Sequence, residues 1–365
     1  MSPPQHLFRI ATTRGLEDLA AAEASAAGLV LSGKEPGAIS ARGSLPAGMR
    51  LCLQGRTIGR VWLTLARYRA RHWDALTGGL AGLPWGRFLP SGSTVAVRAS
   101  SQRSRLYHEG GIAGRVGERL AAKGHPVVPW GEAKQRLLVA VIEDEVSVRL
   151  DLSGEHLARR GWRVDPGLAP LRPDRAAACL IAAGYRGDEA LQLPFCGSGT
   201  LAVEGGWIAA KRAPGLTRPM AFTDWPEVSQ RPWRKMLDEA TVRLQNPVAP
   251  IVAWDLDPQA LSRSRANLAE AKMASWVDVV QGDVGRMPFD PKVRPGLLLA
   301  NPPYGERLGR DFPQRWWQPW VAAGWRVALL RPANAPVPSN SAQALLHFDH
   351  GGLPVTLWQV SPPRP

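Results

Sequence analysis

After residue 185, short apolar segments alternate along the chain with longer segments of helical periodicity, and this alternation limits the possible folds more than any other feature. The apolar segments are EALQLPF, PIVAWD, VDVVQGD, GLLLANPPYG and RVALLRP, and the helical segments include TLAVEGGWIAAKRA and PQALSRSRANLAEAKM. Strands that are apolar along their whole length are typical of parallel sheets with both faces covered. The sequence therefore predicts a doubly wound, Rossmann-like α/β sheet, and ALLHFD–HGG–LPVTLWQV predicts a β-hairpin at its end.

The N-terminal half has a different pattern, and we expect a mixed α+β fold there. Strand-like alternation in Phe8–Thr12 precedes an Ala- and Leu-rich helical segment at Leu16–Ala27. Ile112, Val116 and Leu120 recur at a spacing of four residues, which predicts one apolar face of a helix. The stretch RLLVAVIEDEVSVRLDLSG predicts two strands joined by an acidic turn.

Positive charge exceeds negative charge along the whole chain, and the excess is larger in the N-terminal half. The chain carries a formal net charge of +14. Residues 1–165 hold 23 Lys and Arg against 14 Asp and Glu, a net charge of +9. Such a charge favours polyanionic partners, and nucleic acid is the first candidate. The alternative is a generally basic, arginine-rich proteome.

Other features of the sequence bear on where the protein works. No apolar run approaches the ~18–20 residues that span a bilayer, and MSPPQHLFRI lacks the pattern of a secretory signal. Three cysteines lie far apart and form no CxxC pair, and the seven histidines form no metal-ligand pattern. We therefore expect a cytoplasmic protein without a membrane partner or a bound metal, and we expect a monomer.

The first motif that carries chemistry is a glycine-rich turn between a strand and a helix. It reads Pro-Phe-Cys-Gly-Ser-Gly-Thr from Pro194 to Thr200. Glycines let a backbone approach a ligand closely, and a helix N-terminus offers free N–H donors. The turn also satisfies the loose dinucleotide pattern GxGxxA, and by itself it could be no more than a tight turn.

Aspartates follow the next two strands. Asp255 can accept both hydroxyls of a ribose, as acids do at this place in nucleotide-binding sheets, whereas Asp257 is better placed to cap the following helix. Asp283 can accept a hydrogen bond from an adenine amino group. Asp255 lies 56 residues beyond Gly199, whereas a nicotinamide-binding unit has its acid about 20 residues on, and this spacing argues against a dehydrogenase.

The most specific motif is Asn301-Pro302-Pro303-Tyr304, directly after an apolar strand. Two successive prolines fix the backbone and hold the Asn301 side chain and the Pro302 carbonyl in place. These oxygens can accept both hydrogens of an exocyclic amino group and direct its lone pair at an electrophile, while Tyr304 can stack on the base. The alternative is an ordinary turn at the end of a strand. The glycine turn and the two aspartates at other strand ends argue against this alternative.

These motifs, together with TTRGLE at residues 12–17, RSRLYH at 103–108 and APLR at 169–172, resemble the THUMP-domain class I RNA methyltransferases. The nearest resemblance is to the branch that methylates guanine N2 in bacterial large-subunit ribosomal RNA. It implies a ferredoxin-like domain at 1–65, a THUMP RNA-binding domain at 66–160, a linker with the first helix of the catalytic part at 161–185, and an S-adenosylmethionine-dependent methyltransferase domain at 186–365.

The resemblance also assigns roles to single residues. The acceptor guanine would lie at Asn301, Pro302, Pro303 and Tyr304. S-adenosylmethionine would be bound by Phe195, Gly197, Ser198, Gly199, Thr200, Asp255 and Asp283. The excess of positive charge in the N-terminal half, rather than the resemblance, favours RNA phosphate contacts by Arg103, Arg105, His108, Arg115, Arg159 and Arg160. The alternative is that these basic segments are only solvated faces, and no residue is assigned to a metal.

The sequence departs from the family at two places. The family usually has an acid immediately before the Pro of PFCGSGT, and this chain has Leu193 there. The segment after NPPYGERLG is short and rich in tryptophan (316, 317, 320 and 325), which we interpret as packing. We expect a methyltransferase acting on guanosine N2 in 23S rRNA; the alternatives are a tRNA guanine-N2 methyltransferase, or a non-catalytic RNA-binding or ribosome-assembly factor with a decayed cofactor pocket.

Overall fold

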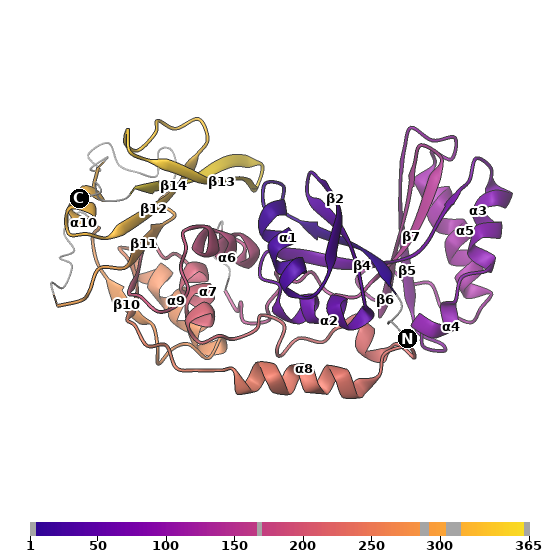
Figure 1. Ribbon diagram of the computed structural model, residues 1–365, viewed down its shortest axis with the longest axis horizontal. Helices are drawn as coiled ribbons and strands as arrows, with labels where there is room; N and C mark the ends of the chain where they lie inside the picture. The colour runs from indigo at the N-terminus through magenta and orange to yellow at the C-terminus, as the bar shows by residue number, and fades with distance from the viewer. Residues whose placement is uncertain (1–4, 166–169, 285–291, 304–314, 361–365) are drawn as a thin grey trace. The chain divides into compact units, whose positions relative to one another are not determined.

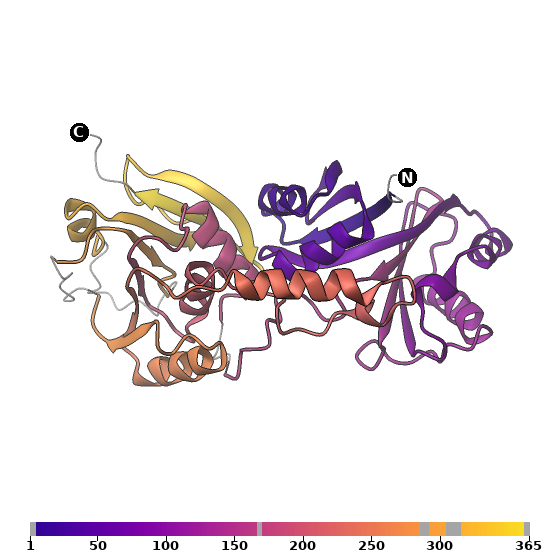
Figure 2. The same cartoon turned by 60° about the horizontal axis from the view of Figure 1, so that its bottom comes forward.

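The computed structural model describes residues 5–165, 170–284, 292–303 and 315–360 (Figures 1 and 2). The chain forms two compact units. Unit 1 comprises residues 1–12, 20–157 and 217–238, and unit 2 comprises residues 13–19, 158–216 and 239–365. Each unit therefore contains a segment that is remote in sequence from its main part, which the sequence did not predict.

Unit 1 is built on a seven-stranded sheet with the strand order β2-β3-β1-β4-β7-β6-β5. All neighbouring strands pair antiparallel except β5 and β6, which pair parallel. The strands are β1 (His6–Thr12), β2 (Val30–Glu35), β3 (Ala38–Gly43), β4 (Ile58–Arg69), β5 (Val95–Gln102), β6 (Gln135–Ile142) and β7 (Glu145–Asp151).

The helices that begin in unit 1 include α5 (Glu109–Ala121), whose buried face carries Ile112, Val116 and Leu120 as predicted. In Figure 1, α3 and α5 lie side by side, and α5 packs on β5. The others are α2 (Leu45–Gln54), α3 (Trp73–Ala81), α4 (Trp85–Phe88), the 3-10 helix η1 (Ala221–Asp224) and α8 (Gln230–Val242), while α1 (Glu17–Ala26) begins in a segment of unit 2.

One long strand joins the two parts of the unit 1 sheet. β4 pairs with β1 over its first residues and with β7 over its later ones. The domain boundary expected between residues 65 and 66 falls inside this strand. The ferredoxin-like and THUMP segments expected from the sequence thus share one continuous sheet, and the expected boundaries stay predictions.

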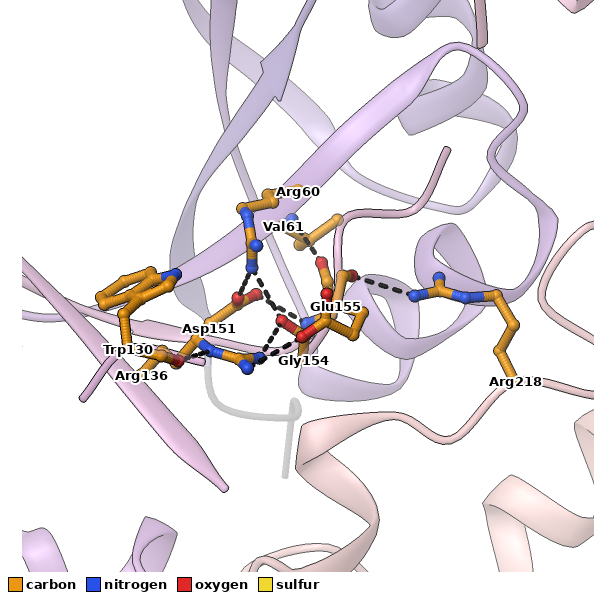
Figure 3. A network of polar contacts seen from close by, with 9 residues as sticks. Arg60, Val61, Trp130, Arg136, Asp151, Gly154, Glu155 and Arg218 are labelled. Carbon is orange, nitrogen blue, oxygen red and sulfur yellow. Dashed lines mark hydrogen bonds and ion pairs between the residues drawn. The ribbon is translucent and has the colours of Figure 1, made fainter. Parts of the chain in front are cut away.

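A polar network closes the end of β7 (Figure 3). The carboxylate of Asp151 is fully buried, pairs with the guanidinium of Arg60 on β4, and accepts a hydrogen bond of 2.8 Å from the Ser153 N–H. Arg136 on β6 donates to the Gly154 carbonyl at 2.6 Å and to the Glu155 carboxylate at 2.8 Å. The network fixes the chain where it leaves the sheet.

Unit 2 contains the predicted doubly wound sheet, with the strand order β10-β9-β8-β11-β12-β14-β13. The first five strands in this order run parallel, and the C-terminal hairpin adds β14 antiparallel to β12. The strands are β8 (Leu191–Pro194), β9 (Ile251–Asp255), β10 (Asp278–Gln281), β11 (Leu297–Ala300), β12 (Arg326–Pro332), β13 (Gln343–His350) and β14 (Leu353–Val360), and the helices are α6 (Pro173–Ala182), α7 (Thr200–Ala209), α9 (Pro258–Glu270) and α10 (Gln318–Ala322).

Both faces of this sheet are covered at its central strands β8, β9, β11 and β12, as their apolar sequences predict, whereas the edge strands β10 and β13 are largely exposed. In β11, Leu297 and Leu299 join the core beneath α6, α7 and α9, whereas Leu298 and Ala300 join a second core on the opposite face. The second core contains the tryptophans at 316, 317, 320 and 325, all at most 8% exposed. The tryptophan-rich segment therefore packs the protein interior. Among the helices of the described ranges, none has both the length and the apolarity to cross a bilayer.

Candidate active site

The predicted functional residues of unit 2 follow the carboxyl ends of four neighbouring strands. Pro194, the last residue of β8, pairs with Trp254 on β9, so the glycine turn begins beside Asp255, the last residue of β9. On the other side of β8, Leu298 of β11 pairs with Gln192, and Asn301 directly follows the end of β11 at Ala300. The chain order of the strands reverses between β8 and β11, and such a switch point is where open α/β sheets bind ligands.

The glycine turn has a left-handed backbone at three residues. Phe195, Gly197 and Gly199 have φ angles of +55°, +54° and +77°. A Cβ at Gly199 would lie 2.9 Å from the Ser264 hydroxyl, so this position requires glycine for both space and conformation. At Gly197 a Cβ would meet no atom within 4 Å, so only the φ angle favours glycine there. Phe195 takes a conformation that is costly for an aromatic residue, a feature that often marks functional sites.

Cys196 in the same turn is a packing residue. Its N–H donates to the Trp254 carbonyl at 3.1 Å, and its sulfur lies 3.4 Å from the Ser264 hydroxyl. Burial raises the pKa of Cys196 to about 12, so the thiol stays neutral near pH 7. A neutral, buried thiol is a poor nucleophile, in agreement with the sequence interpretation of a small residue in a tight turn.

Asp255 connects β9 to the glycine turn. Its Oδ2 accepts a hydrogen bond from the Gly197 N–H at 2.9 Å, and its Oδ1 accepts one from the Asp257 N–H at 3.1 Å. Asp257 caps α9 by accepting from the Gln259 N–H at 2.8 Å, as predicted. Each carboxylate oxygen has two lone pairs, so half-buried Asp255 retains capacity for ligand hydroxyls while it holds the turn.

Two buried side chains of α9 hold the same turn, and the sequence analysis missed both. Ser264 donates to the Gly197 carbonyl at 2.9 Å, and Asn267 donates to the Ser198 carbonyl at 2.9 Å. Both residues are fully buried. The available signal was their three-residue spacing on the helix face that also carries Leu261 and Leu268, because polar residues on an apolar face need partners.

Leu193 stands where the family that the sequence resembles usually has an acid. Its side chain is fully buried in the core beneath α6, α7 and α9. Glu189, a few residues upstream, pairs instead with Arg326. Neither Leu193 nor Glu189 therefore brings a carboxylate to the glycine turn.

The remaining predicted ligand contacts lie at the ends of β10 and β11. Asp283 is half-buried two residues beyond β10, and the preceding Gly282 N–H donates to the Asp255 carbonyl at 3.1 Å. Asn301, Pro302 and Pro303 are half-buried directly after β11. Tyr304 lies outside the described residues, so its stacking role stays a prediction.

The predicted RNA-contacting residues of unit 1 are exposed, although several also have structural partners. Arg115 lies with its guanidinium 4.4 Å from the Trp73 ring, and Arg103 pairs with Glu143 at 2.9 Å. His108 caps α5 by accepting the Gly111 N–H at 2.7 Å. Two further exposed side chains lie in the same unit: Arg98, 4.2 Å from the Trp130 ring, and Tyr107, which is 80% exposed.

The assignment of Arg160 to the RNA surface is wrong. Arg160 is only 4% exposed and pairs at 3.2 Å with Glu204, a fully buried residue of α7. A buried carboxylate needs a cationic partner, and Arg160 supplies it. Its neighbour Arg159 is exposed and stays a candidate.

Comparison with known families assigns domains to both halves of the chain. Residues 160–314 match the family described as "RMKL-like, methyltransferase domain", and residues 8–62 match the "RlmL ferredoxin-like domain". Among curated proteins, the ribosomal RNA large subunit methyltransferase K/L of Methylococcus capsulatus is 35% identical over 350 residues, which are 88% of this chain and 46% of that protein. The protein of the same name from Pseudomonas savastanoi is 35% identical over 329 residues, 85% of this chain and 44% of that protein.

The chain thus spans about half the length of the curated relatives it matches. Solved structures share its fold over nearly the whole chain. SMU.472, solved in complex with SAH, superposes with a TM-score of 0.83 at 23% identity and covers 99% of both chains. TrmN from Thermus thermophilus has a TM-score of 0.71 at 23% identity and covers 98% of this chain and 100% of its own. The chain therefore contains an RlmL-like ferredoxin-like domain and an RMKL-like methyltransferase domain.

Proposed function

We propose that the protein transfers a methyl group from S-adenosylmethionine to the exocyclic N2 of a guanosine in large-subunit ribosomal RNA. The observation that carries this proposal is that the glycine turn, Asp255 and Asn301 lie at the carboxyl ends of three adjacent parallel strands, β8, β9 and β11. The names of the relatives from Methylococcus and Pseudomonas support the RNA class.

The residues around the glycine turn fit this cofactor. Asp255 would accept the two ribose hydroxyls, and Asp283 would accept the adenine amino group. The turn from Phe195 to Thr200 would lie against the methionine part. The bound cofactor supplies an electrophilic methyl group on a sulfonium centre. The buried, neutral Cys196 and the apolar Leu193 place no charge next to that centre.

At the acceptor, the side-chain carbonyl of Asn301 and the main-chain carbonyl of Pro302 would each accept one hydrogen of the guanine amino group. This arrangement directs the nitrogen lone pair at the methyl carbon. A C–N bond forms as the C–S bond breaks, and the amino group releases one proton to solvent. Alignment therefore provides most of the acceleration, and a strong base is not required.

The RNA itself would bind through the positive side chains of unit 1, which we propose acts as a THUMP-type module. Arg103, Arg105 and Arg115 are exposed there, and Arg159 is exposed just beyond it. Contacts with phosphates release counterions, so RNA affinity should fall steeply with salt. Replacing Arg103 and Arg105 together should lower affinity for all RNA sequences and flatten the salt dependence by up to about two contacts.

The test is an assay of the full chain with S-adenosylmethionine and either 23S rRNA or tRNA lacking the modification, followed by nucleoside analysis. We expect N2-methylguanosine in the 23S rRNA alone. Methylation confined to tRNA would reassign the substrate. Absence of SAH binding in calorimetry, with RNA binding retained, would make the protein a non-catalytic RNA-binding factor.

A further inference from the structure

We propose that Asn267 is a positioning residue through which the linker at residues 164–165 holds the cofactor-binding turn in place. This inference rests on the proposed function, because it concerns the turn to which the cofactor is assigned. The consequence is that the affinity for the cofactor would depend on the backbone of the linker, which follows the main part of unit 1 in the chain.

The side-chain amide of Asn267 bonds to two separate segments of the chain at once. Its Oδ1 accepts the Val164 N–H at 2.8 Å and the Asp165 N–H at 3.3 Å. Its Nδ2 donates to the Asp165 carbonyl at 2.9 Å and to the Ser198 carbonyl at 2.9 Å. The side chain is fully buried, so water cannot replace a partner that moves away.

The two α9 side chains also determine which way the peptides of the turn face. Ser264 holds the Gly197 carbonyl and Asn267 holds the Ser198 carbonyl. In a trans peptide the next N–H points opposite to the carbonyl, so the Ser198 N–H faces away from α9. The Gly199 N–H likewise faces away and donates to the Cys196 carbonyl at 2.8 Å. The orientation of the donors in the turn therefore depends on Ser264 and Asn267.

The linker is bonded to the start of α7 as well. Arg163 donates to the Thr200 hydroxyl at 2.7 Å and to the Leu171 carbonyl at 3.0 Å. Arg160 pairs with Glu204 one turn further along the helix. Residues 160–165 thus contact both helices that flank the glycine turn, and the Asn267 side chain bonds to the linker backbone and to the turn backbone together.

The linker backbone can be tested through Val164, whose side chain is 66% exposed. Val164→Pro removes the N–H that Asn267 accepts, while the matched control Val164→Ala keeps it. In the full chain, we expect Val164→Pro to weaken SAH binding, measured by calorimetry, at least 5-fold, and Val164→Ala to leave it unchanged. Equal SAH affinity of both variants and the wild type would overturn the proposal.

Hydrogen exchange of residues 196–200 in the ligand-free chain separates this inference from the proposed function. We expect faster exchange of the turn amides in Val164→Pro alone, whether or not SAH binds. If the wild type binds no SAH but the exchange pattern holds, the proposed function fails and the linker contact stands. Unchanged exchange in Val164→Pro would contradict the linker contact even where the wild type binds SAH.

Asn267→Ala tests the positioning role by kinetics. We expect the KM for S-adenosylmethionine to rise about 10-fold or more, with kcat at saturating cofactor within about 3-fold of the wild type, because the turn can still form once ligand is bound. Ser264→Ala leaves the linker contact intact. It should raise KM, and adding Val164→Pro to this variant should raise KM further. In Asn267→Ala, by contrast, adding Val164→Pro should have no further effect. Additive losses in that double variant would contradict the proposal.

Discussion

Asp151 and Asp255 occupy equivalent local positions in the two units, yet their surroundings give them opposite properties. Each is the last residue of a strand, and each accepts a hydrogen bond from the N–H two residues further on, from Ser153 and Asp257 respectively. The difference lies in the other oxygen. In Asp151 it meets the Arg60 guanidinium, and in Asp255 it meets the Gly197 N–H.

These partners decide what each carboxylate can do. Asp151 is fully buried and paired with Arg60, and Arg136 donates to the nearby Gly154 carbonyl, so structural partners surround this carboxylate (Figure 3). Asp255 is half-buried and held by backbone amides alone, which leaves lone pairs for other donors. A strand-ending aspartate in the sequence therefore indicates a turn, and only its tertiary partners distinguish a structural carboxylate from a ligand-binding one.

The largest expected effect is on stability, at Asp151. Asp151→Ala leaves the Arg60 guanidinium, 17% exposed, without its carboxylate, and breaking such a pair costs about 3–5 kcal/mol. Chemical denaturation monitored by circular dichroism should show this loss. SAH affinity of the folded fraction should match the wild type, and a parallel loss of SAH binding would contradict the separation of the two aspartates.

Asn301→Ala should lower activity and leave stability unchanged, which is the reverse of the effect expected for Asp151→Ala. The residue would contact the acceptor amino group and not the ribose or adenine of the cofactor, so losing it should lower kcat about 100-fold or more. The melting temperature and the SAH dissociation constant should stay close to the wild type. Methyl incorporation into RNA at saturating cofactor checks this prediction, and wild-type turnover would remove Asn301 from the site.

The features that the sequence could predict are those that depend on neighbouring residues in the chain. Strand ends, the glycine turn and the Asp257 cap depend on neighbours within a few residues, and the structure confirms these elements. Arg159 and Arg160 are adjacent, identical residues, and only Arg160 is buried, because its partner Glu204 comes from α7. For contacts at such separations, like those of Asn267 with residues 164 and 198, the local pattern indicates only that a polar residue on an apolar face needs a partner and not which partner it has.

Leu193 is a second position whose role could not be predicted from its local sequence. At the sequence level it marks a missing acid, which suggests a decayed pocket. The structure buries its side chain in the core beneath α6, α7 and α9, where a carboxylate would lack a partner. The cofactor turn is instead held by Asp255, Ser264 and Asn267, which the departure at Leu193 does not affect.

Asp255→Ala should weaken cofactor binding with little effect on stability. Loss of hydrogen bonds to a charged acceptor costs about 2–3 kcal/mol, which corresponds to roughly 30- to 150-fold in the SAH dissociation constant. Asp257→Ala is the matched control, because its side chain caps α9 and pairs with Arg263 at 3.3 Å, whereas that of Asp255 holds the glycine turn; the change should cost about 1 kcal/mol of stability. Calorimetric titration of both variants with SAH checks the pair, and equal affinities would leave Asp255 with a purely structural role like that of Asp151.

The last expected effect is a change in how stability depends on pH, and it again involves Asp151. Burial raises the pKa of Asp151 to about 6 from an ordinary value of 3.8, so between these values the folded chain binds more protons than the unfolded chain. Raising the pH through this window therefore lowers the contribution of Asp151 to the free energy of unfolding. Asp151→Asn cannot titrate, so the free energy of unfolding of this variant relative to the wild type should rise from pH 4 to pH 6 and then level off. Denaturant titrations of both proteins at matched pH measure this difference, and a difference that stays constant with pH would mean that Asp151 does not titrate in this window.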